Sequence, residues 1–230
     1  MLELFRRIRL WLQNFPQRVF DWRFRVDTAG ITRLHYADLA PDVGKSGYCY
    51  EATSKRVFER MMRSIDVDYL RFTFVDVGCG KGAVLLYACE LAFKRIIGIE
   101  VSPTLQQVAQ ANISRYPRQR VRCANISVVC ADGAAFGFPD DPLIVYLYNP
   151  FDEATLSRMF AMLHRSLCQH PREIIIVSYN PDCAFYLDGS SGFAPSAAQN
   201  GGLIKEGTPT ARRASRGLDQ ILSEDEGVQS

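Results

Sequence analysis

The sequence predicts an α/β fold: a doubly wound, mostly parallel sheet with helices on both faces. Two observations predict this class. First, strand-like and helix-like runs alternate with short loops from residue 72 onward, which is the order of consecutive strand–helix–strand units. Second, the strand-like runs, such as RIIGIEV and LIVYLY, are almost continuously apolar. Strands of that kind are buried on both faces of a parallel sheet that helices cover.

Each element follows from its periodicity and its flanking residues. Thr53 or Ser54 is placed to cap the first helix, Ser102 caps a later one with Pro103 in its first turn, and Asp152 precedes another. The predicted strands are 72–77, 95–101, 126–131, 143–148 and 173–179, and the predicted helices are 52–66, 82–92, 103–114 and 152–168.

The chain divides into three parts. Residues 1–66 read as an N-terminal helical extension or lid, 67–187 as the core, and 188–230 as an irregular or disordered tail. Gly, Ser, Ala and charged residues dominate the tail. No strong strand pattern follows residue 187, so either the sheet lacks a C-terminal strand hairpin or those strands have only a weak pattern.

Composition limits the partners and the cellular location that we expect for the protein. The net charge of +2 over 230 residues gives no global reason to expect nucleic acid as a partner. The seven cysteines include no Cys-x-x-Cys pair, which predicts reduced thiols in a cytoplasmic protein and neither a disulfide framework nor a metal site.

The first residues, MLELFRRIRLWLQNF, combine apolar positions at helical spacing with arginines that interrupt the run. That interruption argues against a signal peptide. The run favours a short amphipathic helix packed on the domain. A helix lying on an anionic membrane surface and contact with an acidic partner are the alternatives.

The most informative segment is FTFVDVGCGKGAVLLY, where Asp76 ends a strand-like run and Gly78, Gly80 and Gly82 follow at alternate positions. Glycines in such a turn allow positive φ and a close approach of the backbone to a ligand. The start of the following helix offers unpaired N–H groups. This combination predicts a nucleotide-like cofactor.

Two patterns compete for that turn. Gly78, Gly80 and Ala83 satisfy the dinucleotide fingerprint, with Glu100 roughly 20 residues on. Asp76 with the three glycines instead gives acid-x-Gly-x-Gly-x-Gly, which resembles motif I of the class I (Rossmann-like) S-adenosylmethionine (SAM)-dependent methyltransferases. An acid here suits a cationic sulfonium or amine and would repel a pyrophosphate.

The resemblance implies a role for the acid at each following strand end. Glu100, with Val101 beside it, would accept the ribose hydroxyls, and Asp132, with Gly133, would face the adenine amino group. The cofactor-binding set that follows from it comprises Asp76, Gly78, Cys79, Gly80, Gly82, Glu100, Val101, Asp132, Gly133 and Asn149.

The fourth predicted strand ends in Asn149-Pro150-Phe151. Many amino-methylating members of the class carry [D/N]-P-P-[Y/F/W] there, and this chain has one proline fewer. Together with VDTAG, GYCYEAT and FVDVGCGKG, the segment YLYNPF resembles small, mostly bacterial methyltransferases and, distantly, the non-SET lysine methyltransferases. The resemblance implies that Asn149, Pro150 and Phe151 orient an acceptor amine, and that Tyr48 or Tyr50 lines the site.

We therefore expect SAM-dependent methylation of an amine, with protein lysine as one candidate. The acceptor is a protein or a small molecule, and nucleic acid is less favoured. A non-catalytic SAM-binding or interaction protein is one alternative. An NAD(P)-dependent oxidoreductase is another, although the chain shows no well-placed Tyr-x-x-x-Lys or hydride-site histidine.

Overall fold

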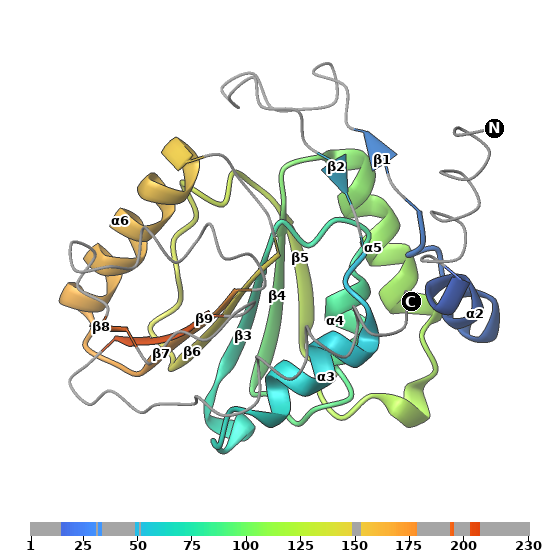
Figure 1. The fold of residues 1–230 in the computed structure, drawn as a ribbon, viewed down its shortest axis with the longest axis horizontal. Helices are drawn as coiled ribbons and strands as arrows, with labels where there is room; N and C mark the ends of the chain where they lie inside the picture. The colour runs from blue at the N-terminus through green and yellow to red at the C-terminus, as the bar shows by residue number, and fades with distance from the viewer. Residues whose placement is uncertain are drawn as a thin grey trace, which may run out of the picture.

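A computed structural model describes residues 15–30, 32–33, 49–50, 52–148, 153–178, 194–195 and 203–207. Its centre is a sheet with the strand order β5-β4-β3-β6-β7-β9-β8 (Figure 1). Strands β3 to β7 pair in parallel, which confirms the predicted doubly wound α/β fold. The strands are β3 (Thr73–Val77), β4 (Arg95–Glu100), β5 (Ile126–Cys130), β6 (Leu143–Leu147), β7 (Ile174–Ser178), β8 (Ala194–Pro195) and β9 (Leu203–Gly207).

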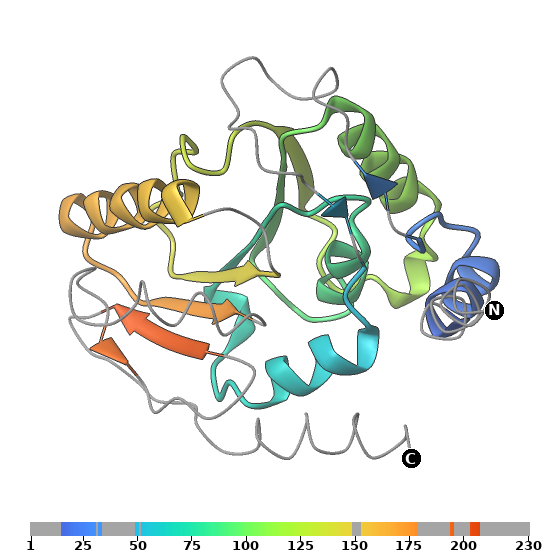
Figure 2. The ribbon, with the colours of Figure 1, turned by 45° about the horizontal axis from the view of Figure 1, so that its top comes forward.

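Helices lie on both faces of this sheet (Figure 2). Ser54 caps α3, its side-chain oxygen accepting a hydrogen bond from the N–H of Val57 at 3.2 Å. Ser102 caps α5 in the same way, with Pro103 in the first turn, as predicted. The helices are α2 (Phe15–Phe24), α3 (Lys55–Arg63), α4 (Ala83–Ala88), α5 (Pro103–Arg115) and α6 (Glu153–Gln169), and β1 (Thr32–Arg33) pairs with β2 (Cys49–Tyr50) in a small separate sheet.

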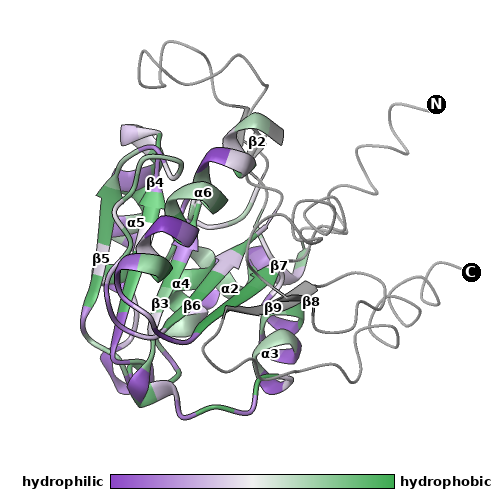
Figure 3. Cartoon of the chain, turned by 90° about the vertical axis from the view of Figure 1, so that its left-hand side faces the viewer, coloured by the Kyte–Doolittle hydropathy of each residue, from purple (hydrophilic) through white to green (hydrophobic). Residues whose placement is uncertain are grey.

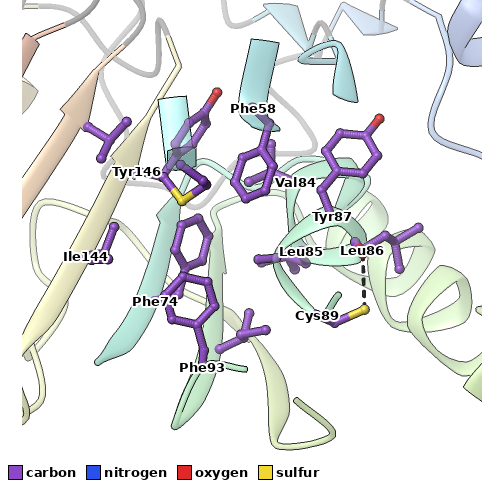
Figure 4. Packing of buried hydrophobic residues seen from close by; sticks show 14 of the residues in the cluster. Phe58, Phe74, Val84, Leu85, Leu86, Tyr87, Cys89, Phe93, Ile144 and Tyr146 are labelled. Carbon is purple, nitrogen blue, oxygen red and sulfur yellow. Dashed lines mark hydrogen bonds between the residues drawn. The ribbon is translucent and has the colours of Figure 1, made fainter. Parts of the chain in front are cut away.

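An aromatic cluster fills the space between the sheet and the helices α3 and α4 (Figure 4). The rings of Phe58 on α3 and Phe74 on β3 meet edge to face, with centroids 6.0 Å apart. Tyr146 on β6 completes the group, its ring centroid 5.9 Å from that of Phe58. All three side chains are almost wholly buried, and each contributes about 1.5–3 kcal/mol of hydrophobic stabilisation. The cluster therefore packs this face of the sheet against α3 and against α4, the helix that follows residues 78–82.

The opposite face is covered more thinly. Helix α6 packs its apolar side on alternate residues of β3, β6 and β7, so the centre of the sheet is apolar on both sides (Figure 3). No helix lies between β5 and β6 in the described chain. Instead, Phe136 and Phe138, whose rings meet edge to face with centroids 5.6 Å apart, pack against the apolar residues between α6 and the sheet.

The prediction that every strand is buried on both faces is wrong for β5. Ser127 and Val129 are exposed, Val129 at 37%. The reason is positional, because β5 is the edge strand of the sheet and pairs only with β4 among the described strands. An apolar run identifies a strand but does not say whether the strand lies at the centre or the edge.

Of the two alternatives for the C-terminal end of the sheet, the absence of a hairpin is wrong, and the presence of weakly patterned strands is confirmed. Strand β9 pairs antiparallel with β7, and β8 pairs antiparallel with β9. The sequence of β9, LIKEG, has only two apolar residues before a charged pair. Its strand is defined by backbone pairing with β7, which leaves little trace in side-chain periodicity.

Helix α2 packs against the outside of the α4–α5 layer through Phe20 and Phe24. Three large apolar side chains of this helix are exposed: Phe15, Val19 and Trp22 are 47%, 45% and 83% exposed. The predicted amphipathic helix of the first residues lies almost wholly outside the described chain. Within the described residues, no helix has the length and hydrophobicity that crossing a membrane requires.

Candidate functional site

The pairing registers bring four strand ends together. Val77 of β3 is opposite Ile99 of β4 and Leu147 of β6, and Glu100 of β4 is opposite Cys130 of β5. The parallel strands therefore present their carboxyl ends at one edge, where doubly wound folds bind ligands. The predicted residues Asp76, Glu100 and Asp132 all belong to this edge.

The glycine turn follows β3 directly. Gly78, Gly80 and Gly82 adopt φ angles of 81°, 54° and 80°, which other residues rarely adopt. The N–H groups of Gly78 and Cys79 both donate to the carbonyl of Ile99, at 2.8 and 2.9 Å. The sequence prediction of a tight glycine turn between β3 and α4 is confirmed.

A buried pair of carboxyl groups lies behind the turn. Asp76 is 4% exposed and Glu100 is 5% exposed. Burial, together with the charge of Glu100, raises the pKa of Asp76 to about 8. Burial also raises the pKa of Glu100, although its carboxylate accepts backbone N–H bonds. Two buried acids whose ionisation is suppressed favour a cationic ligand, which restores the charged form.

Glu100 fixes the shape of the turn. One carboxylate oxygen accepts the N–H of Gly80 at 2.7 Å, and the other accepts the N–H of Ser102 at 2.9 Å. Each carboxylate oxygen has a second acceptor position. Glu100 can therefore accept hydroxyl groups from a ligand while it continues to hold the turn.

Cys79 lies inside the turn and packs inward. Burial and the neighbouring carboxyls Asp76 and Glu100 raise the pKa of its thiol well above the ordinary value, so the thiol stays protonated and unreactive. Gly98 makes room for it: a Cβ atom on Gly98 would lie 2.8 Å from the Cys79 sulfur and 2.6 Å from Leu85 Cδ1. The turn thus rests directly on β4.

Asp132 stands at the end of β5, half-buried. One of its oxygens accepts the N–H of Ala134 at 2.8 Å, and the other lies 3.8 Å from an Arg158 nitrogen on α6. Gly133 is buried beside it. Val101 follows Glu100 at the end of β4 and receives a weak contact from the Cys130 thiol. These residues border the edge where β4 and β5 end.

Asn149, Pro150, Phe151 and Tyr48 lie outside the described residues. Strand β6 ends at Leu147, Tyr148 follows it, and α6 begins at Glu153. Of Tyr50 the structure describes the backbone, which pairs with Thr32.

Sequence reasoning missed the contacts that hold the turn from the other side. Asn112 on α5 is fully buried and hydrogen-bonds the backbone at Asp27 and Lys81. A signal was present in the sequence, because Asn112 continues the buried stripe Leu105 and Ala109 at helical spacing. A polar residue on a buried apolar stripe indicates a hydrogen-bond partner, because buried polar groups are nearly always hydrogen-bonded.

Comparison with known proteins fits this site. A family model described as a methyltransferase domain matches residues 74–170, which span β3 to the end of α6. The chain therefore carries a SAM-dependent methyltransferase domain with a Rossmann-like fold. No curated protein sequence matches it.

Solved structures resemble the fold at low identity. A precorrin-6y C5,15-methyltransferase from Geobacter metallireducens is 17% identical with a TM-score of 0.51, covering 70% of this chain and 90% of that one. A predicted N6-adenine-specific DNA methylase from Listeria monocytogenes is 11% identical with a TM-score of 0.51, covering 69% of this chain and 52% of that one. Both resemblances concern the fold.

Proposed function

We propose that this methyltransferase transfers the methyl group of SAM to an amine, with protein lysine as the first acceptor to test. One observation carries the proposal: Asn149-Pro150-Phe151 begins two residues after the end of β6, and β6 pairs with β3, the strand that leads into the glycine turn. The segment resembles the [D/N]-P-P-[Y/F/W] loop of amino-methylating enzymes.

Each site residue has a role in this proposal. Asp76 receives the cationic end of the cofactor because its buried carboxyl gains most from a nearby positive charge. The carboxylate of Glu100 accepts hydrogen bonds from the ribose hydroxyls, and that of Asp132 accepts one from the adenine amino group. Gly78, Gly80 and Gly82, with Cys79, form the floor, and Val101 and Gly133 border the nucleoside.

Bound SAM supplies an electrophilic methyl group on a sulfonium. The side chain of Asn149 and the carbonyl of Pro150 would accept hydrogen bonds from the amine, and Phe151 would pack on it. Such alignment of nucleophile and methyl group is the main contribution a protein makes to a transfer of this kind. Asn149 is an amide and takes no proton, so the acceptor enters as the free amine.

The test uses SAM labelled in its methyl group. The chain is incubated separately with lysine-rich proteins, small amines and RNA, and the labelled product is identified by mass spectrometry. We expect N-methylated lysine or amine. Asn149→Ala should lower kcat, because it removes the side chain that would orient the amine. Label found only on oxygen or carbon acceptors, or only on RNA, would overturn the amine proposal.

Asp76→Ala tests the cofactor assignment independently of the acceptor. It should abolish SAM binding, because it removes the carboxyl that answers the cofactor's charge. Gly137→Ala is the matched control, since a Cβ on this exposed loop glycine meets no atom within 4 Å. Unchanged SAM affinity in Asp76→Ala would contradict the role given to Asp76.

A further inference from the structure

The N-terminal residues 26–30, here called the clasp, adjoin the glycine turn of residues 78–82. We propose that the clasp belongs to the cofactor site, and that Asn112 and Lys81 are positioning residues that fasten it to the turn. By doing so they hold the turn in its cofactor-binding shape before the cofactor arrives. The inference rests on the proposed role of the glycine turn in binding SAM.

Asn112 connects the two segments through its side-chain amide. Its oxygen accepts the N–H of Asp27 at 2.8 Å, and its nitrogen donates to the carbonyls of Asp27 at 2.8 Å and Lys81 at 2.9 Å. The residue is fully buried. An amide is the side chain that offers an acceptor and two donors in this arrangement, so Asn112 locks the clasp and the turn into one register.

Lys81 makes the same connection from within the turn. Its ammonium group lies 2.9 Å from an Asp27 carboxylate oxygen and 3.2 Å from the Ala29 carbonyl. The Asp27 side chain is 59% exposed, and exposed ion pairs add little to stability. The two contacts do define where residues 27 to 29 lie relative to the turn.

The far side of the clasp is anchored as firmly. The N–H groups of Thr28 and Ala29 donate to one carboxylate oxygen of Asp21 at 2.8 and 2.7 Å. Gln17 donates to the Thr28 hydroxyl and accepts from the hydroxyl of Tyr87 on α4, the latter at 2.8 Å. Helix α2 thereby serves as a frame that ties the clasp to the helix that follows the turn.

The turn is consequently held from two sides. Glu100 binds the N–H of Gly80 from β4, and Asn112 binds the carbonyl of Lys81 from α5. Gly82 lies against the same face of α5, where a Cβ on Gly82 would lie 3.0 Å from Ala109 Cβ. A turn ordered in advance does not lose conformational freedom when the cofactor binds, so the clasp should raise cofactor affinity.

The experiment compares Asn112→Ser and Lys81→Met with the control Thr73→Val. Thr73 donates to Asp141 at 2.8 Å at the start of β3, away from the carboxyl edge. Calorimetry measures the affinity of the full chain for S-adenosylhomocysteine. Hydrogen exchange of residues 78–82 is followed without ligand.

We expect both clasp variants to bind S-adenosylhomocysteine about tenfold more weakly and to exchange faster across the turn. Thr73→Val should change neither affinity nor exchange at the turn, although it lowers the melting temperature. Lys81→Met keeps the stem of the side chain, so it tests the proposal even if Asn112→Ser fails to fold.

Wild-type affinity and wild-type exchange in Lys81→Met would overturn the positioning role. An equal loss of affinity in Thr73→Val would also overturn it, because a general structural defect would then explain the loss. If the wild type does not bind S-adenosylhomocysteine, the proposed cofactor residues fail instead. The exchange of residues 78–82 then still decides whether the clasp holds the turn.

Discussion

Replacing Gly98 by alanine tests how closely the cofactor turn rests on the sheet. The new Cβ would lie 2.6 Å from Leu85 Cδ1, 2.8 Å from Cys79 Sγ and 3.2 Å from Cys79 Cβ. Leu85 is fully buried and Cys79 is 5% exposed, so neither side chain can move into open space. Overpacking of this kind costs about 1–3 kcal/mol.

The assay is urea unfolding followed by circular dichroism, with thermal melting as a second measurement. A loss of 1 kcal/mol lowers Tm by about 2–4 °C in a protein of this size. Gly98→Ala should also weaken SAM binding, because Cys79, one of the two side chains that it displaces, belongs to the turn itself. Gly137→Ala is the control and should stay within about 0.5 kcal/mol of the wild type.

Leu85→Ala, alone and combined with Gly98→Ala, identifies the atom responsible. Leu85 Cδ1 is the nearest obstacle at 2.6 Å, so the double variant should be more stable than the sum of the single losses predicts, by at least about 0.5 kcal/mol. Superimposable unfolding curves for Gly98→Ala and Gly137→Ala would refute the packing argument.

Four further predictions concern charge and capping. Because the pKa of Asp76 is raised from 3.8 to about 8, the folded protein holds this proton more tightly than the unfolded chain, and its stability falls as the pH rises through that window; Asp76→Asn should flatten the dependence. At pH 7, SAM binding should release about one proton, measured by calorimetry in buffers of different ionisation enthalpy, and a binding enthalpy that does not depend on the buffer would contradict this. Although burial opposes the shift, hydrogen bonds from Arg120 and Lys55 lower the pKa of Glu90 from 4.5 to about 2. Ionised Glu90 therefore stabilises the fold above this pH window, and the stabilisation is lost as the pH falls through it. Glu90→Gln should remove this loss of stability at acid pH, measured by urea unfolding. Ser102→Ala removes the α5 cap and should cost about 1 kcal/mol in urea unfolding, while an unchanged midpoint would show that the cap contributes nothing.

Local chemistry made the centre of the fold predictable. The turn after β3 announces itself because positive φ angles require glycine, and Ser102 followed by Pro103 marks a helix start by residue type alone. By contrast, the pairing of β9 with β7 and the exposure of β5 depend on the order of the strands in the sheet. Periodicity along the chain carries no information about that order.

In the candidate site, too, some residues could be predicted from the sequence and others could not. Asp76 and Glu100 could be predicted because each ends an apolar run that is itself a strand. The hydrogen bond between Asn112 and Asp27 joins residues 85 positions apart, and the sequence around one residue does not identify the other as its partner. The buried amide on an apolar helix face signalled that a partner exists, and the structure supplied its identity.

The exposed ring of Trp22 makes α2 an optical reporter. The chain contains two tryptophans, Trp11 and Trp22, and Trp22 is already 83% exposed in the folded protein. Unfolding therefore changes the surroundings of its indole very little, and its emission follows global denaturation poorly. Anything that comes to lie on the outer side of α2 would shift that emission and shield it from a quencher. In a Trp11→Phe background, intrinsic fluorescence becomes a selective signal for events on that one helix.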